Sequence, residues 1–168
     1  MWWELYRRWT LWDFARRVRK HGWTGTYVRG EGASFAYSIG FWESAQAPEV
    51  IMFGMTQEIA NGLLWEAHRQ LKSGELTLQD KAAWSLDWED GPQFAWRMVH
   101  PTQIRREHFN IAIWHQERQG GRRADLRAFQ LFVTDTHGLF PWDEGFDTEY
   151  RPVQPELYLP FFGPADDD

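Results

Sequence analysis

The sequence predicts a single α+β domain with a mixed, mostly antiparallel sheet of about five strands and two or three helices packed mainly on one face. Three observations lead to this fold class. Residues 34–41 alternate large apolar with small side chains, which is the period of a strand. Residues 50–53 form a continuous apolar run, typical of a strand buried on both faces. Apolar residues at helical spacing in 11–18 and 57–73 predict packed helices.

The N-terminal segment carries apolar residues on two opposite sides of a helical wheel, so one straight helix would be apolar on both sides. Thr10, with Asp13 three positions later, resembles the start of a capped helix, and we therefore expect a break at Thr10. Gly22 is a suitable end for the second helix. These features divide the chain into an aromatic appendage (1–9), a single domain (10–160) and an acidic tail (161–168).

The other elements follow along the chain. Residues 42–48 are expected to form a polar bend, because Pro48 disfavours a helical conformation for the residue before it. Thr56 is expected to cap the next helix and Gly74 to end it. The buried stripe of that helix is predicted at Ile59, Leu63, Leu64, Ala67 and Leu71. The remaining segments are strands at 23–29, 94–99 and 128–134, a polar connection at 75–93, a short helix from Thr102 to Phe109, and a segment at 110–119 that fits helix or strand.

Composition limits the function classes. The chain has 12 Trp and 12 Phe among 168 residues, which predicts a core and interfaces rich in aromatic side chains. A net charge of −6 argues against nucleic-acid binding by the surface as a whole. The charge is uneven, since residues 1–31 carry a net +4 and residues 135–168 a net −8. The absence of cysteine excludes disulfides, thiolate zinc sites and a cysteine nucleophile.

Targeting and cofactor motifs are also missing from the sequence. No apolar run is long enough to span a membrane, and the charged, Trp-rich first residues do not resemble a signal peptide, so we expect a cytoplasmic protein. No pair of the six histidines has HxH or HExxH spacing, so neither a metal site nor another cofactor is expected. A GxSxG nucleophile motif and a GxGxxG phosphate loop are absent, and the motifs therefore name no reaction.

Several short motifs occur in a characteristic order. They are His21-Gly22-Trp23, 35–41 (FAYSIGF), Pro48-Glu49 leading into 52–55 (MFGM), 129–131 (FQL) with Asp135 and Gly138, 140–143 (FPWD) and Gln154-Pro155. With this pattern the chain resembles the bacterial family called domain of unknown function 4262, over roughly residues 13–158. Ser38 and Phe41 stand where that family usually has Thr and Leu, which keeps a hydroxyl and an apolar group. The resemblance implies a bacterial protein but no activity, substrate or cofactor.

Polar residues at the strand ends and turns of these motifs suggest one cleft. If strands 34–41, 50–55 and 128–134 are neighbours, these ends converge beneath an aromatic roof that contains Trp142. The polar residues are Tyr37, Ser38, Glu49, Gln130, Asp135, His137 and Gln154. The leading hypothesis is therefore a binding module for a small polar or nucleotide-like ligand.

Two other functions remain open. A protein-interaction module, such as an immunity or accessory factor, would contact a protein partner through Trp2, Trp3, Tyr6 and Trp9. A hydrolase would use Asp135 and His137 as orienter and base. A purely structural interpretation competes with all three functions, because Asp-x-x-Gly at Asp135 is typical of a type I turn and Glu49 would then simply pair with an arginine.

Overall fold

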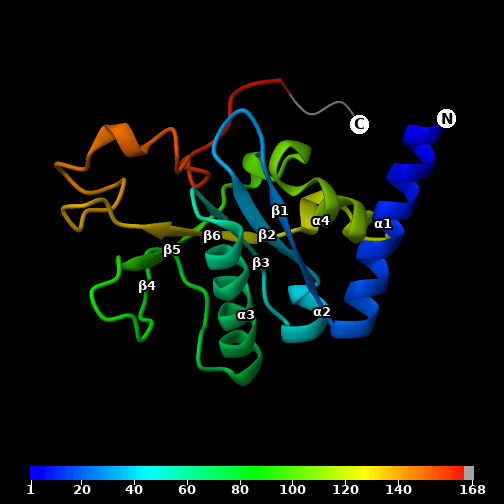
Figure 1. Cartoon of the computed structure of the whole chain (residues 1–168), viewed down its shortest axis with the longest axis horizontal. Helices are drawn as coiled ribbons and strands as arrows, with labels where there is room; N and C mark the ends of the chain where they lie inside the picture. Colours follow the sequence, from blue (N-terminus) through cyan, green and yellow to red (C-terminus); the bar gives the residue numbers. More distant parts are fainter. Residues whose placement is uncertain (165–168) are drawn as a thin grey trace.

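The computed structural model describes residues 1–164, so the last four residues of the expected acidic tail lie outside the described part. Within this range the chain forms one six-stranded sheet in the order β1-β2-β3-β6-β5-β4 (Figure 1). The predicted α+β class is confirmed, with one strand more than expected. The strands are β1 (Thr24–Val28), β2 (Phe35–Ile39), β3 (Glu49–Phe53), β4 (Ala83–Trp84), β5 (Phe94–Met98) and β6 (Ala128–Val133).

The sheet consists of two antiparallel halves that meet at a parallel seam. Strands β1, β2 and β3 form one meander, and β4, β5 and β6 form the other. β3 and β6 pair in parallel, with Glu49 opposite Ala128 and Met52 opposite Leu131. The short strand β4 lies in the segment 75–93, where the sequence predicted only a connection. Its Trp84 is buried beside Trp96, which explains why this short segment pairs with the sheet.

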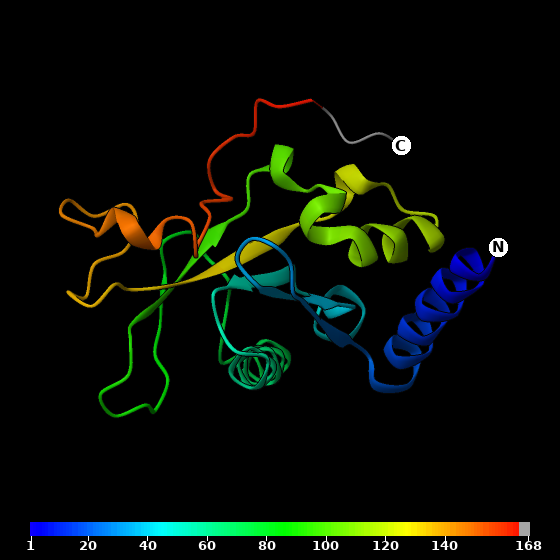
Figure 2. The ribbon, with the colours of Figure 1, turned by 45° about the horizontal axis from the view of Figure 1, so that its top comes forward.

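Helices cover both faces of the sheet, so the expectation that they pack mainly on one face is wrong. Helix α3 (Gln57–Ser73) packs on the face that carries Ala36 and Met52, and α4 (Arg106–Arg118) packs on the face that carries Tyr37 and Ile51 (Figure 2). Period 2 sends neighbouring residues of β2 and β3 to opposite faces, and both sets are apolar except for Ser38 and Glu49. Each face therefore needs a helix to cover it.

Helix α1 (Trp2–His21) is continuous, and the predicted break at Thr10 is wrong. The Thr10 hydroxyl donates to the Tyr6 carbonyl at 2.9 Å, so it is satisfied inside the helix and caps nothing. The helix is apolar on two opposite sides, as the helical wheel predicted. One side packs on the domain through Val18, and the other faces solvent. Gly22 ends the helix with φ 84°, as expected from the sequence.

The other helices correct several local predictions. The expected polar bend contains a short helix, α2 (Phe41–Ala45). Thr56 and Gly74 do bound α3, but Ile59 is 45% exposed, and Ala60 and His68 are buried in the stripe instead. The predicted helix from Thr102 to Phe109 is interrupted: a 3-10 turn (Pro101–Gln103) comes first, and α4 begins at Arg106. α4 then continues through most of the segment that fitted helix or strand. In the described part of the chain, no helix has the length and apolarity needed to cross a membrane.

Candidate functional site

The residues of the predicted polar cleft lie at opposite ends of the parallel pair β3–β6. Because β3 and β6 are parallel and Glu49 lies opposite Ala128, Glu49 is at the beginning of the pair, whereas Asp135 follows its end. At about 3.3 Å per residue, the seven residues from Ala128 to Asp135 separate the backbones of Glu49 and Asp135 by about 23 Å along the strand direction. The sequence-predicted site residues therefore belong to separate groups.

Asp135 organises the loop after β6. Its Oδ1 accepts hydrogen bonds from the backbone N–H groups of His137 (2.8 Å) and Leu139 (2.9 Å), and its Oδ2 accepts one from Asp147 (2.9 Å). Burial raises the pKa of Asp135, but these three donors lower it more, so that this pKa lies below its usual range. The exposed His137 contributes its backbone N–H to this arrangement. This geometry matches the turn interpretation of Asp-x-x-Gly.

Gln130 and Gln154 fasten the C-terminal segment to β6. The Gln130 amide donates to the Pro155 carbonyl at 2.6 Å and accepts from the Leu157 N–H at 3.0 Å. The Gln154 amide pairs with both backbone groups of Val133, at 2.9 and 3.1 Å, as a neighbouring strand would. Both side chains are buried, and their polar groups are used within the protein.

The aromatic roof at Trp142 is filled by the protein itself. The Arg97 guanidinium carbon lies 4.6 Å from the centroid of Trp142 and 3.7 Å from that of Tyr158. Phe140 stacks on Trp142 with centroids 4.9 Å apart and planes 7° from parallel. Arg97 also contacts Asp80 at 3.0 Å. These contacts occupy the faces on which a ligand would stack.

Tyr37 lies on the other face of β2 from Ser38. Its hydroxyl accepts a hydrogen bond from the Ile111 N–H at 3.1 Å, where α4 is kinked at Phe109 (φ −127°). Burial raises the pKa of Tyr37 to about 12, so the side chain is a neutral, structural hydroxyl. Tyr37 therefore holds α4 on the sheet.

Ser38 and Glu49 remain together, in the interior at the beginning of β3. The Glu49 carboxylate accepts hydrogen bonds from the Ser38 hydroxyl, the Gly40 N–H (2.7 Å) and the Phe41 N–H (3.1 Å). These partners replace the arginine that the structural interpretation expected. Burial raises the pKa of Glu49 to about 7, although the three donors oppose that shift. Glu49 thus changes its charge near neutral pH.

Gly40 makes this arrangement sterically possible. Its φ of 98° is a conformation that residues with side chains rarely adopt. A Cβ at this position would lie 2.8 Å from Val18 Cγ1 and 2.9 Å from the Gly22 carbonyl oxygen. The close approach joins the end of α1 to the start of α2, and it aims the N–H groups of Gly40 and Phe41 at Glu49.

A cavity of about 390 Å³ adjoins Glu49, between α2, α4 and the turn before β6. We call it the Glu49 pocket. Its volume falls within the range of small-molecule sites. The residues that bear on its chemistry are Trp42, Glu43, Glu49, His115 and Arg127. Trp42 is 62% exposed and forms an aromatic wall at the mouth.

The rim of the Glu49 pocket carries a second carboxylate in a different charge state. Glu43 Oε1 lies 2.5 Å from His115 Nε2 and 2.5 Å from Gln119 Nε2. Partial burial raises the pKa of Glu43, but hydrogen bonds from His115 and Gln119 lower it more, and the net pKa is below its usual value. An ionised carboxylate at the rim therefore faces the same cavity as a carboxyl that titrates near pH 7.

Sequence reasoning missed Glu43, His115 and Gln119. One signal was available, since His115 in α4 and the C-cap residue Gln119 are four residues apart, a spacing that places them on one side of the helix. Their meeting with Glu43 joins positions 72 and 76 residues apart, which no local pattern encodes.

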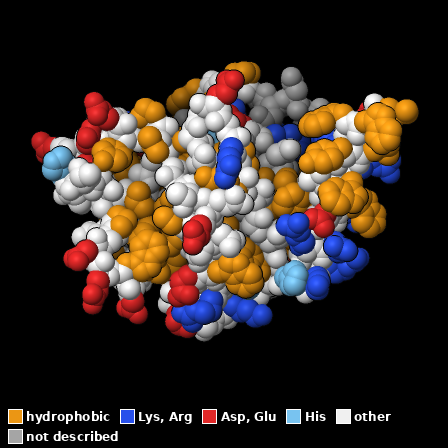
Figure 3. Space-filling view, in the orientation of Figure 1, with side chains coloured by type: hydrophobic (Ala, Val, Ile, Leu, Met, Phe, Trp, Pro, Cys, Tyr) orange, Lys and Arg blue, Asp and Glu red, His pale blue; other side chains and the backbone are white. Residues whose placement is uncertain are grey.

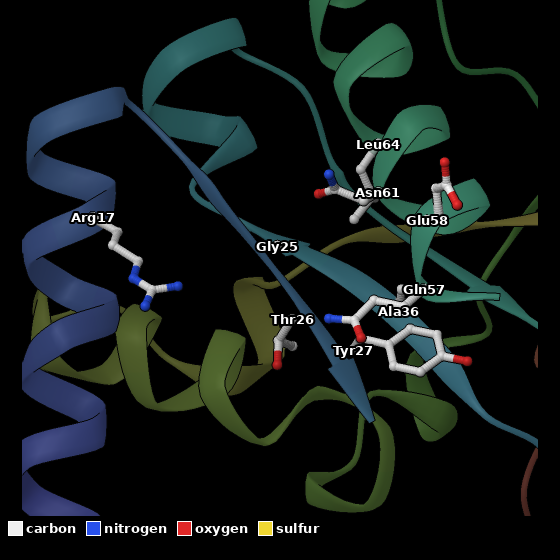
Figure 4. A pocket seen from close by; sticks show the side chains of 9 residues that line it. All are labelled: Arg17, Gly25, Thr26, Tyr27, Ala36, Gln57, Glu58, Asn61 and Leu64. Atoms are coloured by element: carbon white, nitrogen blue, oxygen red, sulfur yellow. The ribbon is translucent and has the colours of Figure 1, made fainter. Parts of the chain in front are cut away.

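A second, larger hollow lies on the other side of α2, as an open groove of about 520 Å³ between β1, α1 and the first turns of α3 (Figure 4). Its charged and amide side chains are Arg17, Gln57, Glu58 and Asn61, which are all exposed. Arg17 is paired with Asp13 at 2.7 Å. The Glu49 pocket is the better candidate site, because it contains a buried ionisable group. Within residues 1–164, no three His, Asp or Glu side chains gather as a metal site would require.

Comparison with known proteins agrees with the motifs. The model of the family described as "Domain of unknown function (DUF4262)" matches residues 17–147. No curated protein and no solved structure matches the chain. Three of the segments that carry the resemblance meet around Gly40, which contacts Gly22 and donates a hydrogen bond to Glu49. With most of its length covered by that model, the chain belongs to the DUF4262 family of domains of unknown function.

Proposed function

We propose that this domain binds a small polar or nucleotide-like ligand in the Glu49 pocket. One observation carries the proposal: a buried carboxyl group with a pKa of about 7 lies beside a cavity of ligand size. Perturbed ionisable groups in cavities are enriched at functional sites. The proposed site differs from the cleft expected from the sequence, since it keeps Glu49 and replaces the other residues by Glu43, His115 and Trp42.

The pocket chemistry favours a ligand that presents amino or amide N–H groups. Glu43 presents a carboxylate acceptor at the rim, and the Glu49 carboxylate, which already accepts from Ser38, Gly40 and Phe41, adds negative charge at the floor when it is ionised. Trp42 offers an aromatic surface for a planar group or a cation. The Arg127 guanidinium donates to the Ala124 and Leu126 carbonyls, so much of its donor capacity is used by the backbone. Nucleobases with exocyclic amines and small amines therefore fit better than phosphates alone.

A ligand screen by thermal shift tests the proposal. The panel contains nucleosides, nucleotides, amino acids, polyamines and sugars. A ligand at about 100 times its Kd adds about 2.7 kcal/mol to the free energy of unfolding, which shifts the melting temperature by several degrees. Binding of a cationic ligand should strengthen from pH 6 to pH 8, because Glu49 becomes ionised over that range.

Matched variants locate the binding site. Glu43→Gln and Trp42→Ala should weaken binding at least about tenfold, since each removes a pocket contact. Glu89→Gln and Trp65→Ala are the controls, because both residues are exposed and lie outside this pocket. A hit that Glu43→Gln and Trp42→Ala leave unchanged would place the ligand elsewhere, and a screen without hits would contradict the proposed ligand class.

A cytoplasmic location and a bacterial source stay part of this proposal and rest on the sequence. The two other functions expected from the sequence also stay predictions. Hydrolysis by Asp135 and His137 gains no support from geometry, because three backbone donors engage the Asp135 carboxylate. Interaction with a protein partner would depend on the aromatic residues of α1.

A further inference from the structure

Helix α1 carries an apolar stripe that faces solvent. Its members lie three, seven and ten residues after the first, which places them on one side of the helix. The stripe consists of Trp2 (84% exposed), Leu5 (54%), Trp9 (67%) and Trp12 (57%). It is about 15 Å long at 1.5 Å per residue. We call it the α1 stripe.

Three residues of the α1 stripe, Trp2, Leu5 and Trp9, are turned away from the rest of the molecule, whereas the ring of Trp12 contacts the Arg118 guanidinium of α4, 4.8 Å from the ring centroid. On the side of the helix opposite the α1 stripe, Val18 is buried against the domain, and Leu11 and Phe14 are partly buried. Trp3 and Tyr6 stack with centroids 6.1 Å apart and line a small cavity toward α4. The stripe itself keeps its outward side free along the protruding end of α1 (Figure 1), where hydrophobic side chains gather on the surface (Figure 3).

Basic residues continue the same helix face. Arg16 and Lys20 lie seven and eleven residues after Trp9, so they follow the α1 stripe in line, and Arg8 and Arg19 flank it. The helix holds six basic and two acidic residues, whereas the whole chain has a net charge of −6. Figure 3 shows the basic side chains toward the end that carries α1 and acidic ones at the opposite end. The charge is therefore polarised, and the tryptophans of the α1 stripe lie at the basic end.

We infer that α1 docks on an anionic lipid surface and lies parallel to it, with the α1 stripe in the headgroup region. Tryptophan concentrates at this boundary, and the stripe holds three Trp and one Leu. A basic, aromatic helix gains both from apolar burial and from attraction to anionic lipids. The acidic end of the molecule points away from the lipid in this orientation, so net repulsion by the domain is small.

Vesicle sedimentation of the full chain tests the inference. The protein should pellet with phosphatidylcholine vesicles that contain 30% phosphatidylglycerol, and not with pure phosphatidylcholine. The triple variant Trp2→Ser, Trp9→Ser, Trp12→Ser should lower the partition coefficient more than about 100-fold. Arg16→Gln with Lys20→Gln should lower it about 30-fold, because each basic residue near the surface contributes about fivefold.

Matched controls keep the test specific. Trp42→Ser, Trp65→Ser and Trp88→Ser remove three other exposed tryptophans, and Arg29→Gln with Lys81→Gln removes two exposed charges outside α1. Both control variants should bind like the wild type, and circular dichroism should show that all variants are folded. Failure of the wild type to bind anionic vesicles, or equal loss in the controls, overturns the inference. If light scattering then shows a dimer that depends on the α1 stripe, the stripe serves self-association. If the protein is a monomer, the stripe would instead bind a protein partner.

Discussion

The two ends of the β3–β6 seam each hold a buried carboxylate with three hydrogen-bond donors, yet their pKa values shift in opposite directions. Glu49 is 5% exposed and Asp135 is 7% exposed. The pKa of Glu49 rises to about 7, whereas that of Asp135 falls below its usual value. The number of donors is equal, so it does not explain the difference.

The surroundings of the two groups explain it. Glu49 lies in the interior beneath α2, and the nearby Glu43 carboxylate adds repulsion to the cost of burial. Asp135 lies in a surface loop, where its three donors are backbone N–H groups of that loop. The comparison shows that a low exposed fraction does not by itself raise a pKa. The direction of the pKa shift depends on the balance between two effects: burial by the surrounding protein raises the pKa, and hydrogen-bond donors to the carboxylate lower it.

The largest expected effect is at the Glu49 end. Gly40→Ala should lower the free energy of unfolding by about 3 to 4 kcal/mol, because the residue has φ 98° and its Cβ would meet Val18 and the Gly22 carbonyl. Urea denaturation measures the change. Gly30→Ala is the matched control, since no atom lies within 4 Å of its added Cβ. Equal effects of the two substitutions would contradict the steric role of Gly40.

The second effect is the pH dependence of Glu49. Its folded-state pKa of about 7 exceeds the ordinary value of 4.5, so its contribution to stability is complete below about pH 4.5 and is lost as the pH rises through 7. The wild type should lose about 3 kcal/mol relative to Glu49→Gln between pH 4.5 and pH 8. Denaturation at several pH values measures this difference. Parallel curves for the two proteins would show that Glu49 titrates normally, and Glu89→Gln controls for surface charge.

The third effect concerns the attachment of the C-terminal segment at the other end. Gln154→Ala should lower the free energy of unfolding by about 2 kcal/mol, because it leaves the N–H and carbonyl of Val133 without their partner. Hydrogen exchange should also accelerate at the Val133 amide. Gln79→Ala, at an exposed position, is the control. Unchanged exchange at Val133 in Gln154→Ala would show that this pairing does not hold the segment.

The smallest expected effect is the pH dependence of Asp135, which should have the opposite direction to that of Glu49. The depressed pKa of Asp135 contributes stability above its ordinary value of 3.8, and this contribution is lost as the pH falls through the folded-state pKa. Acid unfolding of Asp135→Asn should therefore depend less on pH below pH 4 than that of the wild type. Asp87→Asn should behave like the wild type. A pH dependence of Asp135 in the same direction as that of Glu49 would refute the contrast between the two ends.

Local sequence signals predicted much of the fold. Alternation identified β2, the continuous apolar run identified β3, and Thr56 and Gly74 marked the ends of α3. The break at Thr10 failed because a capping pattern in the sequence does not show whether its hydroxyl bonds to the previous turn. The wheel of α1 was read correctly as apolar on two sides, but apolarity does not say what covers each side.

The candidate site was less predictable than the fold. Glu49 was identified because a carboxylate beside an apolar strand needs partners. The predicted grouping of Glu49 with Asp135 was wrong because the sequence showed only that both lie at strand ends. Glu49 is at the beginning of β3 and Asp135 follows the end of β6, and a parallel pair puts these two positions at opposite ends. The contact between Glu43 and His115 depends on how α2 and α4 pack on the same sheet, which is a tertiary property.

The parallel seam also sets an order of folding events. Within the two meanders, paired residues are at most 39 apart in sequence (Phe94 and Val133), whereas the seam pairs residues 79 apart, 49–52 with 128–131. Loop closure over that distance carries an entropic cost that local pairing avoids. We expect the two meanders to form first and their docking to limit the folding rate. The Glu49 pocket, which needs both β3 and the turn before β6, is then among the last parts of the molecule to be completed.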